Sequence, residues 1–165
     1  MHTIIETALG ELTLVGRDGA LSGIYFPGHW TKPDRGAFGE RTDRGFEEIE
    51  RQLGEYLAGE RTAFSLPAAA AGDAFERQVW EIIRRIQYGH TTTYGAIAQE
   101  LGNPTLARRV GNAVAHNPLS IVVPCHRVVG SDGSLTGYAG GLERKRFLLE
   151  LEGALLPLAT SARLF

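Results

Sequence analysis

The stretch "TTTYGAIAQELGNPTLARRVGNAVAHNP", residues 91–118, decides what kind of fold this chain forms. It contains two short runs of apolar residues at helical spacing, with Gly102 between them. The first run predicts a helix that begins near Thr93 and stops at Gly102. The second predicts a helix with Pro104 in its first turn and Asn117-Pro118 at its end. Two short helices joined by a tight, glycine-containing turn are typical of a helix-turn-helix.

The segments around this stretch have mainly helical patterns. Upstream, residues 74–86 ("AFERQVWEIIRRI") place apolar residues on one helical face, and downstream, residues 142–153 ("LERKRFLLELEG") predict a final amphipathic helix. Residues 129–141 ("VGSDGSLTGYAGG") are rich in turn residues and predict a small hairpin or wing. The apolar face of the upstream helix comprises Phe75, Val79, Ile82, Ile83 and Ile86.

The first third of the chain has the pattern of an antiparallel sheet. Residues 3–7 ("TIIET") and 11–16 ("ELTLVG") are short runs with β-branched residues. Residues 17–26 follow, and their Asp18-Gly19 pair favours a tight hairpin turn. Residues 28–39, which contain three glycines and one proline, predict a loop.

A helix and one further strand are predicted before the two halves join. From Asp43 to Gly59 the apolar residues recur at helical spacing, and residues 61–67 ("RTAFSLP") predict a strand. The alanine-rich residues 68–73 form a plausible linker. We therefore expect an α+β protein with an N-terminal α/β domain over residues 1–70 and a mainly helical C-terminal domain over residues 71–165.

Composition indicates a soluble globular protein of 165 residues, with 43% apolar and 22% charged residues. The net charge of −2 gives no general sign of a nucleic-acid-binding protein. Its distribution is uneven, because residues 1–72 hold seven basic and eleven acidic groups, whereas residues 73–165 hold ten and eight. No apolar run approaches the roughly 18 residues of a membrane span, and the first residues lack the pattern of a signal peptide. A single cysteine excludes an internal disulfide, so we expect a cytoplasmic protein.

That cysteine lies in "IVVPCHRVVG", residues 121–130. A free cysteine is more often an inert, buried hydrophobic residue than a nucleophile. Three neighbours favour a reactive thiol here: His126 is adjacent, Arg127 supplies a positive charge that would favour the thiolate, and Pro124 fixes a turn. Adjacent side chains of an extended segment point to opposite faces, so contact between Cys125 and His126 requires a helical turn or a bridging water.

A histidine that acts as a base needs an acceptor to orient it. Glu143, Glu150 and Glu152 follow it in the chain, and the pattern does not choose among them. An activated thiol beside a helix-turn-helix is compatible with DNA chemistry or with a thiol-sensing regulator. A Cys-His hydrolase is a weaker alternative, since no oxyanion hole can be identified.

The sequence resembles the O6-alkylguanine-DNA alkyltransferases, also called methylated-DNA–protein-cysteine methyltransferases. The resemblance is dense over "IVVPCHRVVGSDGSLTGYAGG" (121–141), "ERKRFLLELEG" (143–153) and residues 75–118. It is looser over residues 10–26 and 51–67. It implies an N-terminal ribonuclease-H-like domain with an antiparallel sheet and a C-terminal domain of winged-helix type with a helix-turn-helix.

The resemblance also implies a reaction and its residues. Cys125 would take the alkyl group from O6 of guanine in double-stranded DNA and keep it as a thioether, once per molecule. His126 resembles the base that reaches the thiol through a water, and Glu152 the acid that orients this histidine. Asn117 matches the residue that ties the recognition helix to the cysteine turn. Tyr94 matches the tyrosine whose hydroxyl meets N3 of the departing guanine.

Pocket positions follow in the same way. Val128 and Tyr138 match pocket walls, and the backbone around Tyr138 and Ala139 would meet O6. Some members carry serine where this chain has Ala139. No cofactor and no metal are implied, because the chain has no cysteine in the N-terminal region, where some members bind zinc.

The implied partner is duplex DNA, with the damaged nucleotide flipped out of the stack through the minor groove. Arg108 aligns with the arginine that fills the vacated place. Arg109 stands where the family usually has a small residue, so it could add a phosphate contact or take over that role. Asn103 and Ser131 align with backbone-contacting positions. We expect a monomer in solution, with several molecules able to bind along DNA, and with O4-alkylthymine as a further candidate substrate.

Overall fold

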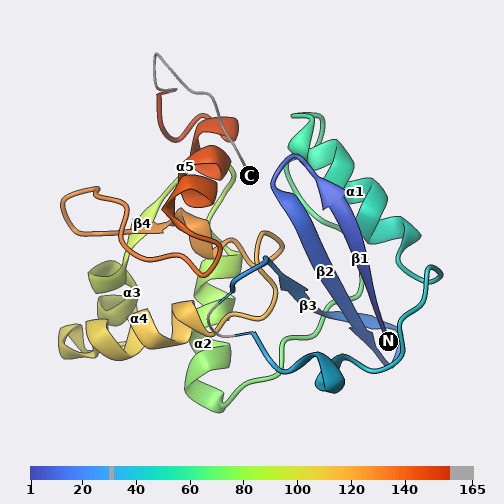
Figure 1. The fold of residues 1–165 in the computed structure, drawn as a ribbon. Helices are drawn as coiled ribbons and strands as arrows, with labels where there is room; N and C mark the ends of the chain where they lie inside the picture. The colour runs from blue at the N-terminus through green and yellow to red at the C-terminus, as the bar shows by residue number, and fades with distance from the viewer. Residues whose placement is uncertain (30–31, 157–165) are drawn as a thin grey trace.

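The N-terminal region forms a three-stranded antiparallel sheet in the computed structural model, which describes residues 1–29 and 32–156. The strands are β1 (His2–Thr7), β2 (Gly10–Arg17) and β3 (Ala20–Tyr25), in the order β1-β2-β3 (Figure 1). Asp18 and Gly19 both have positive φ angles, 53° and 79°, which is the conformation of a type I′ hairpin turn. The predicted hairpin is therefore confirmed.

Helix α1 (Glu47–Leu57) packs against one face of this sheet. Its buried residues Ile49 and Leu53 belong to the same core as Leu12 and Leu14 of β2. The helix begins at Glu47 rather than near Asp43. The predicted loop covers the opposite face of the sheet. It contains a short 3-10 helix, η1 (Arg35–Phe38). There Phe38 packs with Val15 and Tyr25. Residues 30–31 of that loop lie outside the described residues.

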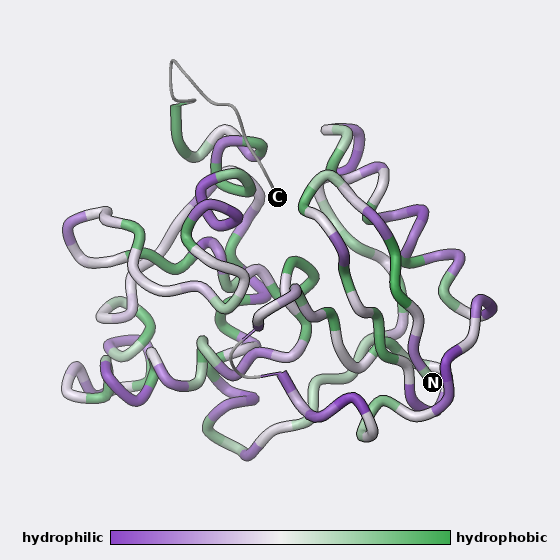
Figure 2. The backbone as a smooth tube through the Cα atoms, in the orientation of Figure 1, coloured by the Kyte–Doolittle hydropathy of each residue, from purple (hydrophilic) through white to green (hydrophobic). Residues whose placement is uncertain are grey.

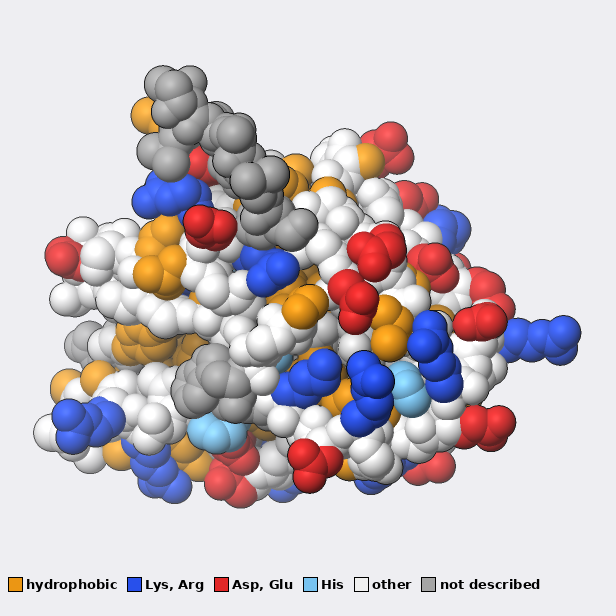
Figure 3. Space-filling model, viewed as in Figure 1, with side chains coloured by type: hydrophobic (Ala, Val, Ile, Leu, Met, Phe, Trp, Pro, Cys, Tyr) orange, Lys and Arg blue, Asp and Glu red, His pale blue; other side chains and the backbone are white. Residues whose placement is uncertain are grey.

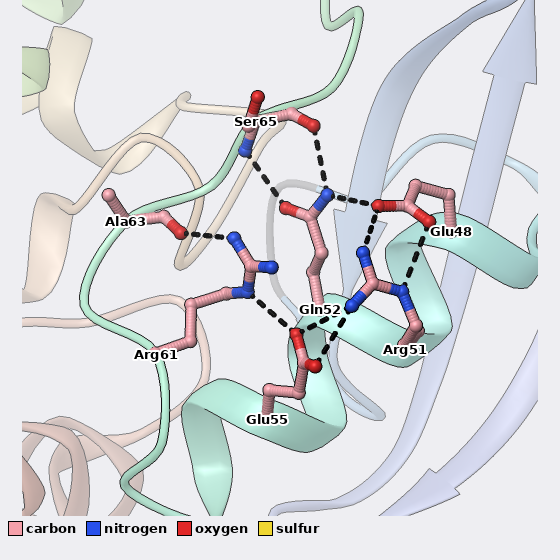
Figure 4. Close-up of polar contacts among 7 residues, drawn as sticks. All are labelled: Glu48, Arg51, Gln52, Glu55, Arg61, Ala63 and Ser65. Atoms are coloured by element: carbon pink, nitrogen blue, oxygen red, sulfur yellow. Dashed lines mark hydrogen bonds and ion pairs between the residues drawn. The ribbon is translucent and has the colours of Figure 1, made fainter.

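The predicted strand at residues 61–67 is not present; side chains of α1 hold this segment instead. The Gln52 amide donates to the Ser65 carbonyl and accepts from the Ser65 N–H, both at 2.9 Å (Figure 4). Arg61 donates to Glu55 at 2.9 Å and to the Ala63 carbonyl at 3.0 Å. These side chains satisfy the backbone groups that a strand ladder would otherwise pair. The segment meets β3 at its end, where the Leu21 N–H donates to the Pro67 carbonyl at 2.9 Å and Leu21 forms an isolated bridge with Ala68.

The C-terminal region is mainly helical, as predicted. Helix α2 (Ala74–Arg84) starts at a capping box formed by Asp73 and Glu76. Helix α3 (Tyr94–Glu100), the 3-10 turn η2 (Pro104–Leu106) and helix α4 (Ala107–Ala115) form the predicted helix-turn-helix. Trp80 packs in the core, and its indole N–H donates to the Ala113 carbonyl of α4 at 2.8 Å. The remaining elements are β4 (Thr92–Thr93), η3 (Cys125–Arg127), β5 (Val128–Val129) and α5 (Leu142–Leu151).

Residues 129–141, for which a small hairpin or wing is predicted, form a loop in which the described residues show no hairpin strands. Its base is closed by a hydrogen bond from the Gly130 N–H to the Ser134 carbonyl at 2.9 Å. The carbonyls of Thr136 and Gly137, which a hairpin would pair, instead accept hydrogen bonds from the ammonium group of Lys145 at 2.9 and 3.2 Å. Strand β5 accordingly pairs in parallel with β4.

The sheet and α1 lie beside the helical half of the molecule (Figure 1), and long-range hydrogen bonds among the described residues join the two. The Ile24 N–H of β3 donates to the Pro118 carbonyl at 2.8 Å, directly after α4. Arg144 of α5 donates to the Leu9 carbonyl at the tip of the first hairpin, at 2.8 Å. The Tyr56 hydroxyl of α1 donates to Glu152 at the end of α5.

Hydropathy and charge fit this arrangement. The helices alternate hydrophobic and hydrophilic residues along their length in Figure 2, as expected for helices with one buried face. Acidic side chains gather over the half of the molecule that holds the sheet and α1 (Figure 3), where α1 alone contributes four glutamates. None of the helices among the described residues is long and apolar enough to span a membrane.

Gly140 provides a test of the packing between the two halves. A Cβ at this buried position would lie 2.7 Å from the Phe26 ring, which is itself fully buried. We expect Gly140→Ala to lower the free energy of unfolding by about 1–3 kcal/mol, measured by urea denaturation. Gly54→Ala is the matched control, because Gly54 is an exposed helical residue with free space around it. It should raise stability by about 0.5–1 kcal/mol. Equal effects from both substitutions would contradict the packing argument.

Candidate functional site

Cys125 begins the 3-10 turn η3, in a segment held in a strained conformation. Ile121, a β-branched residue, has a φ of 75°, which such residues rarely adopt. The turn is closed by hydrogen bonds from the Cys125 N–H to the Val123 carbonyl and from the Arg127 N–H to the Pro124 carbonyl. The cysteine is 4% exposed. The structure thus supplies the helical turn that the sequence required for Cys125 and His126 to cooperate.

A cavity of about 270 Å³ contains Cys125 in its wall. Of the predicted pocket residues, Tyr138 and Ala139 line it and Val128 does not. Val128 is fully buried, and its backbone carbonyl accepts a hydrogen bond from Lys145 at 2.6 Å. The lining comprises Tyr94, Gly111, Val114, Ala115, Asn117, Ser120, Cys125, Thr136, Gly137, Tyr138 and Ala139.

Asn117 connects the end of α4 to the segment that carries the cysteine. Its side-chain amide donates to the Val123 carbonyl at 2.9 Å, and its side-chain oxygen accepts from the Leu119 N–H at 3.0 Å. The residue is buried and lines the cavity. A displacement of α4 would therefore be transmitted to the backbone two residues before the thiol.

His126 is paired with Glu152, the third of the three glutamates considered as acceptors. Both side chains are fully buried, and His126 Nε2 lies 2.8 Å from Glu152 Oε2. An ionised carboxylate can only accept, so Nε2 carries the proton and Nδ1 presents a lone pair. That Nδ1 is buried without a hydrogen-bond partner among the described residues. Burial lowers the pKa of His126, so the imidazole is neutral and able to accept a proton.

Glu152 also accepts hydrogen bonds from the Arg127 guanidinium, at 2.8 and 2.9 Å, and from the Tyr56 hydroxyl. Burial alone would raise the pKa of Glu152, but the hydrogen bonds from His126 and Arg127 hold it well below its usual range. Arg127 also donates from Nη1 to the Ile86 carbonyl at 2.6 Å. The charge of Arg127 is thus paired with Glu152, and the positive charge that favours the thiolate of Cys125 comes from Lys145.

Lys145 is the charged residue near the thiol that the sequence pattern missed. It is fully buried, and its ammonium group donates to the carbonyls of Val128, Thr136 and Gly137. Burial lowers its pKa to about 8. Burial also raises the pKa of the Cys125 thiol, although a hydrogen bond from Asn117 and the charge of Lys145 oppose this effect. A buried cation bonded to several carbonyls is the signal in the structure; in the sequence Lys145 resembles a solvated helix residue.

The predicted DNA-contacting residues lie on the surface. Arg108 and Arg109 of α4 are exposed, as are Asn103 and Ser131. The Arg109 guanidinium stacks over the Phe75 ring of α2, at 3.9 Å from its centroid. Asn103 caps η2 by accepting from the Thr105 N–H at 3.0 Å.

The predicted tyrosine of the site comes from the first turn of α3. The Tyr94 hydroxyl donates to the Thr136 carbonyl at 3.1 Å. Thr136 lies on the loop whose carbonyls Lys145 bonds. The structure therefore brings Tyr94, Asn117, Cys125, Tyr138 and Ala139 together around the cavity. His126 and Glu152 lie buried beside it.

Two family models match almost the whole chain. Residues 1–70 match the ribonuclease-like domain of 6-O-methylguanine DNA methyltransferase, and residues 74–154 match the DNA-binding domain of the same family. The chain belongs to the 6-O-methylguanine DNA methyltransferase family.

Similar proteins are known from bacteria and archaea. The methylated-DNA–protein-cysteine methyltransferase of Mycolicibacterium paratuberculosis is 46% identical over 92% of this chain and 91% of its own length. That of Methanosarcina acetivorans is 42% identical over 93% of this chain and 98% of its own length. A crystal structure of Mycobacterium tuberculosis O6-methylguanine methyltransferase superimposes with a TM-score of 0.85 at 41% identity, covering 94% of each chain. A structure of Mycobacterium tuberculosis OGT in complex with DNA gives a TM-score of 0.81 at 41% identity over 93% and 92%.

The raised pKa of Cys125 predicts how the free protein reacts with a small electrophile. The rate of alkylation by iodoacetamide should rise with pH to a midpoint above that of a cysteine-containing peptide, because burial disfavours the thiolate. The midpoint is read from intact-mass kinetics across pH, and Cys125→Ser is the blank, since the chain has no second cysteine. A midpoint below that of the peptide would show that the free protein holds a thiolate.

Proposed function

We propose that this protein repairs DNA by direct transfer of the alkyl group from O6-alkylguanine in duplex DNA to Cys125. The observation that carries the proposal is the sole thiol of the chain in the wall of a cavity beside a helix-turn-helix, next to a buried histidine–glutamate pair. Family membership and the names of the relatives support methylated DNA as the substrate. The relative bound to DNA supports a duplex as the partner.

The chemistry follows from the partners of each group. The Cys125 sulfur attacks the alkyl carbon, the bond from that carbon to O6 breaks, and a thioether forms. The thiol proton passes through a water to His126 Nδ1, whose lone pair meets no donor from the described residues. Tyr94 donates its hydroxyl proton to N3 of the leaving guanine, which otherwise departs as an anion. Proton exchange with solvent then returns His126 and Tyr94 to their starting states.

A buried and protonated thiol suits a protein that acts once. Because burial keeps the resting thiol protonated, deprotonation is coupled to the presence of the substrate. The product thioether has no leaving group that water could displace under mild conditions. The chain has no second cysteine that could accept the alkyl group in turn. We therefore infer a single turnover per molecule.

Entry of the target base requires the nucleotide to leave the stack. Arg108 precedes Gly111 by three residues and Ala115 by seven, so it shares a face of α4 with two residues that line the cavity. Arg109 points to another face and stacks on Phe75. We assign the role of filling the vacated place to Arg108, with α4 in the minor groove. Asn103 and Ser131 are assigned to the DNA backbone on either side.

Mass spectrometry of the intact protein tests the reaction. Incubation with a duplex that contains O6-methylguanine should add one methyl group per chain, on the peptide that holds Cys125, with no increase on longer incubation. Cys125→Ser should bind the duplex and gain no mass. A wild-type protein that binds the lesion and stays unmodified would refute the proposal. A parallel duplex with O4-methylthymine measures the breadth of the substrate range.

Arg108→Ala tests the assignment on α4. Transfer from duplex DNA should slow by roughly tenfold or more, because the unfilled stack favours return of the base. Transfer from free O6-methylguanine base should be unchanged, since no flipping is needed. Arg109→Ala is the matched control on the adjacent residue and should keep most of the duplex rate. If Arg108→Ala slowed methyl transfer equally from duplex DNA and from the free base, the assignment of Arg108 would be refuted. If Arg109→Ala lost more of the duplex rate than Arg108→Ala, the role would belong to Arg109.

A further inference from the structure

One donor to the buried carboxylate comes from the other half of the molecule. The Tyr56 hydroxyl of α1 donates to Glu152 Oε2 at 2.5 Å, although the two residues are 96 positions apart. Tyr56 is 1% exposed. The oxygen that it contacts is the one that faces His126 Nε2. The tyrosine therefore acts on the acceptor whose charge orients the proposed base.

The two carboxylate oxygens have different sets of donors. Oε2 accepts from the Tyr56 hydroxyl, from His126 Nε2 and from Arg127 Nη2. Oε1 accepts from Arg127 Nε and, at 3.4 Å, from the Gly89 N–H. Among the described residues, Tyr56 is the one donor to Glu152 from the sheet and α1. Its hydroxyl is neutral, so it withdraws negative charge from Oε2 without adding a full positive charge.

The position of the Tyr56 ring is fixed from several sides. It packs edge-on against Tyr88, with ring centroids 6.2 Å apart, and at a tilt against Phe64 at 5.3 Å. The segment that carries Phe64 is held to α1 by two contacts (Figure 4). The Gln52 amide bonds the N–H and the carbonyl of Ser65, and Arg61 of the segment donates to Glu55 of α1. The α1 helix and this segment thus form a frame that aims the hydroxyl at Glu152.

We propose that Tyr56 is a positioning residue for alkyl transfer, which sets the charge on Glu152 Oε2 and through it the basicity of His126. This inference rests on the proposed function, because it assigns His126 the role of proton acceptor. It gives the N-terminal half of the molecule a chemical part in the reaction, in addition to its packing against the helical half.

The expected effect has a definite sign. Without the hydroxyl, Oε2 carries more uncompensated negative charge, which stabilises the protonated imidazole and raises the pKa of His126. The base is then neutral only at higher pH, so the acid limb of the rate profile moves upward. The titratable and charged groups around the pair, on all the elements that pack against it, are Tyr56, Tyr88, Arg127, Tyr138 and Lys145, together with Cys125.

Single-turnover rates of methyl transfer as a function of pH, measured with the full chain, provide the test. Tyr56→Phe should move the acid limb to higher pH by about half a unit to one unit. Within that limb the rate should fall several-fold. Tyr88→Phe is the matched control, because it removes a hydroxyl from the same aromatic cluster that donates to the Leu151 carbonyl rather than to the carboxylate. Its profile should overlay that of the wild type.

A second substitution covers the case in which Tyr56→Phe does not fold. A ring-fluorinated tyrosine introduced at position 56 keeps the shape and strengthens the donor, so the acid limb should move to lower pH. An unchanged limb with fluorotyrosine, or with folded Tyr56→Phe, would overturn the inference. Equal shifts in Tyr56→Phe and Tyr88→Phe would do the same, because they would indicate general loosening of the cluster. Failure of the wild-type protein to take up a methyl group would refute the proposed function instead.

Discussion

The structure depends on one buried carboxylate. An ionised glutamate out of contact with water is costly unless charged and polar donors surround it, and Glu152 obtains these donors from three separate parts of the chain. Tyr56 comes from α1, Gly89 from the turn after α2, and His126 and Arg127 from η3. Each of these parts must be in place before the charge is compensated. Glu152 therefore links the packing of the two halves to the geometry of the site, and loss of Glu152 would affect both.

A second buried charge organises the other wall of the cavity. Lys145 donates to the carbonyls of Val128, Thr136 and Gly137, and so links β5 to the loop that follows it. Tyr94 bonds the same Thr136 carbonyl from the first turn of α3. The protein itself supplies the hydrogen-bond partners of both buried charges, and Lys145 thereby holds Thr136 and Gly137, two residues that line the cavity. A site of this kind is preorganised before any ligand arrives, at a cost in desolvation that the surrounding hydrogen bonds offset.

Local patterns in the sequence were sufficient for the helices, for the hairpin at Asp18-Gly19 and for the helix-turn-helix, because each depends on residues close in the chain. Contacts between distant segments were not predictable in this way. Nothing near Tyr56 distinguishes it from an apolar helix residue, and Lys145 lies in a run that has the pattern of a solvated helix. The choice of Glu152 came from family resemblance rather than from spacing, and the hydrogen bond to His126 gives it a physical basis. The predicted hairpin after β5 failed because a side chain competes for its carbonyls.

The bond from Asn117 to Val123 has a consequence for the length of the chain around it. A single amide spans from the end of α4 to the backbone just before the thiol, and Ile121 adopts a strained backbone conformation within this connection. This bond fixes the length of the segment between Asn117 and Val123. Adding or deleting one residue between Asn117 and Val123 would change the distance between α4 and Cys125. The exposed loop around Ser131 carries no such constraint on its length. Among related proteins, insertions and deletions should accordingly occur in the loop around Ser131 rather than between Asn117 and Val123.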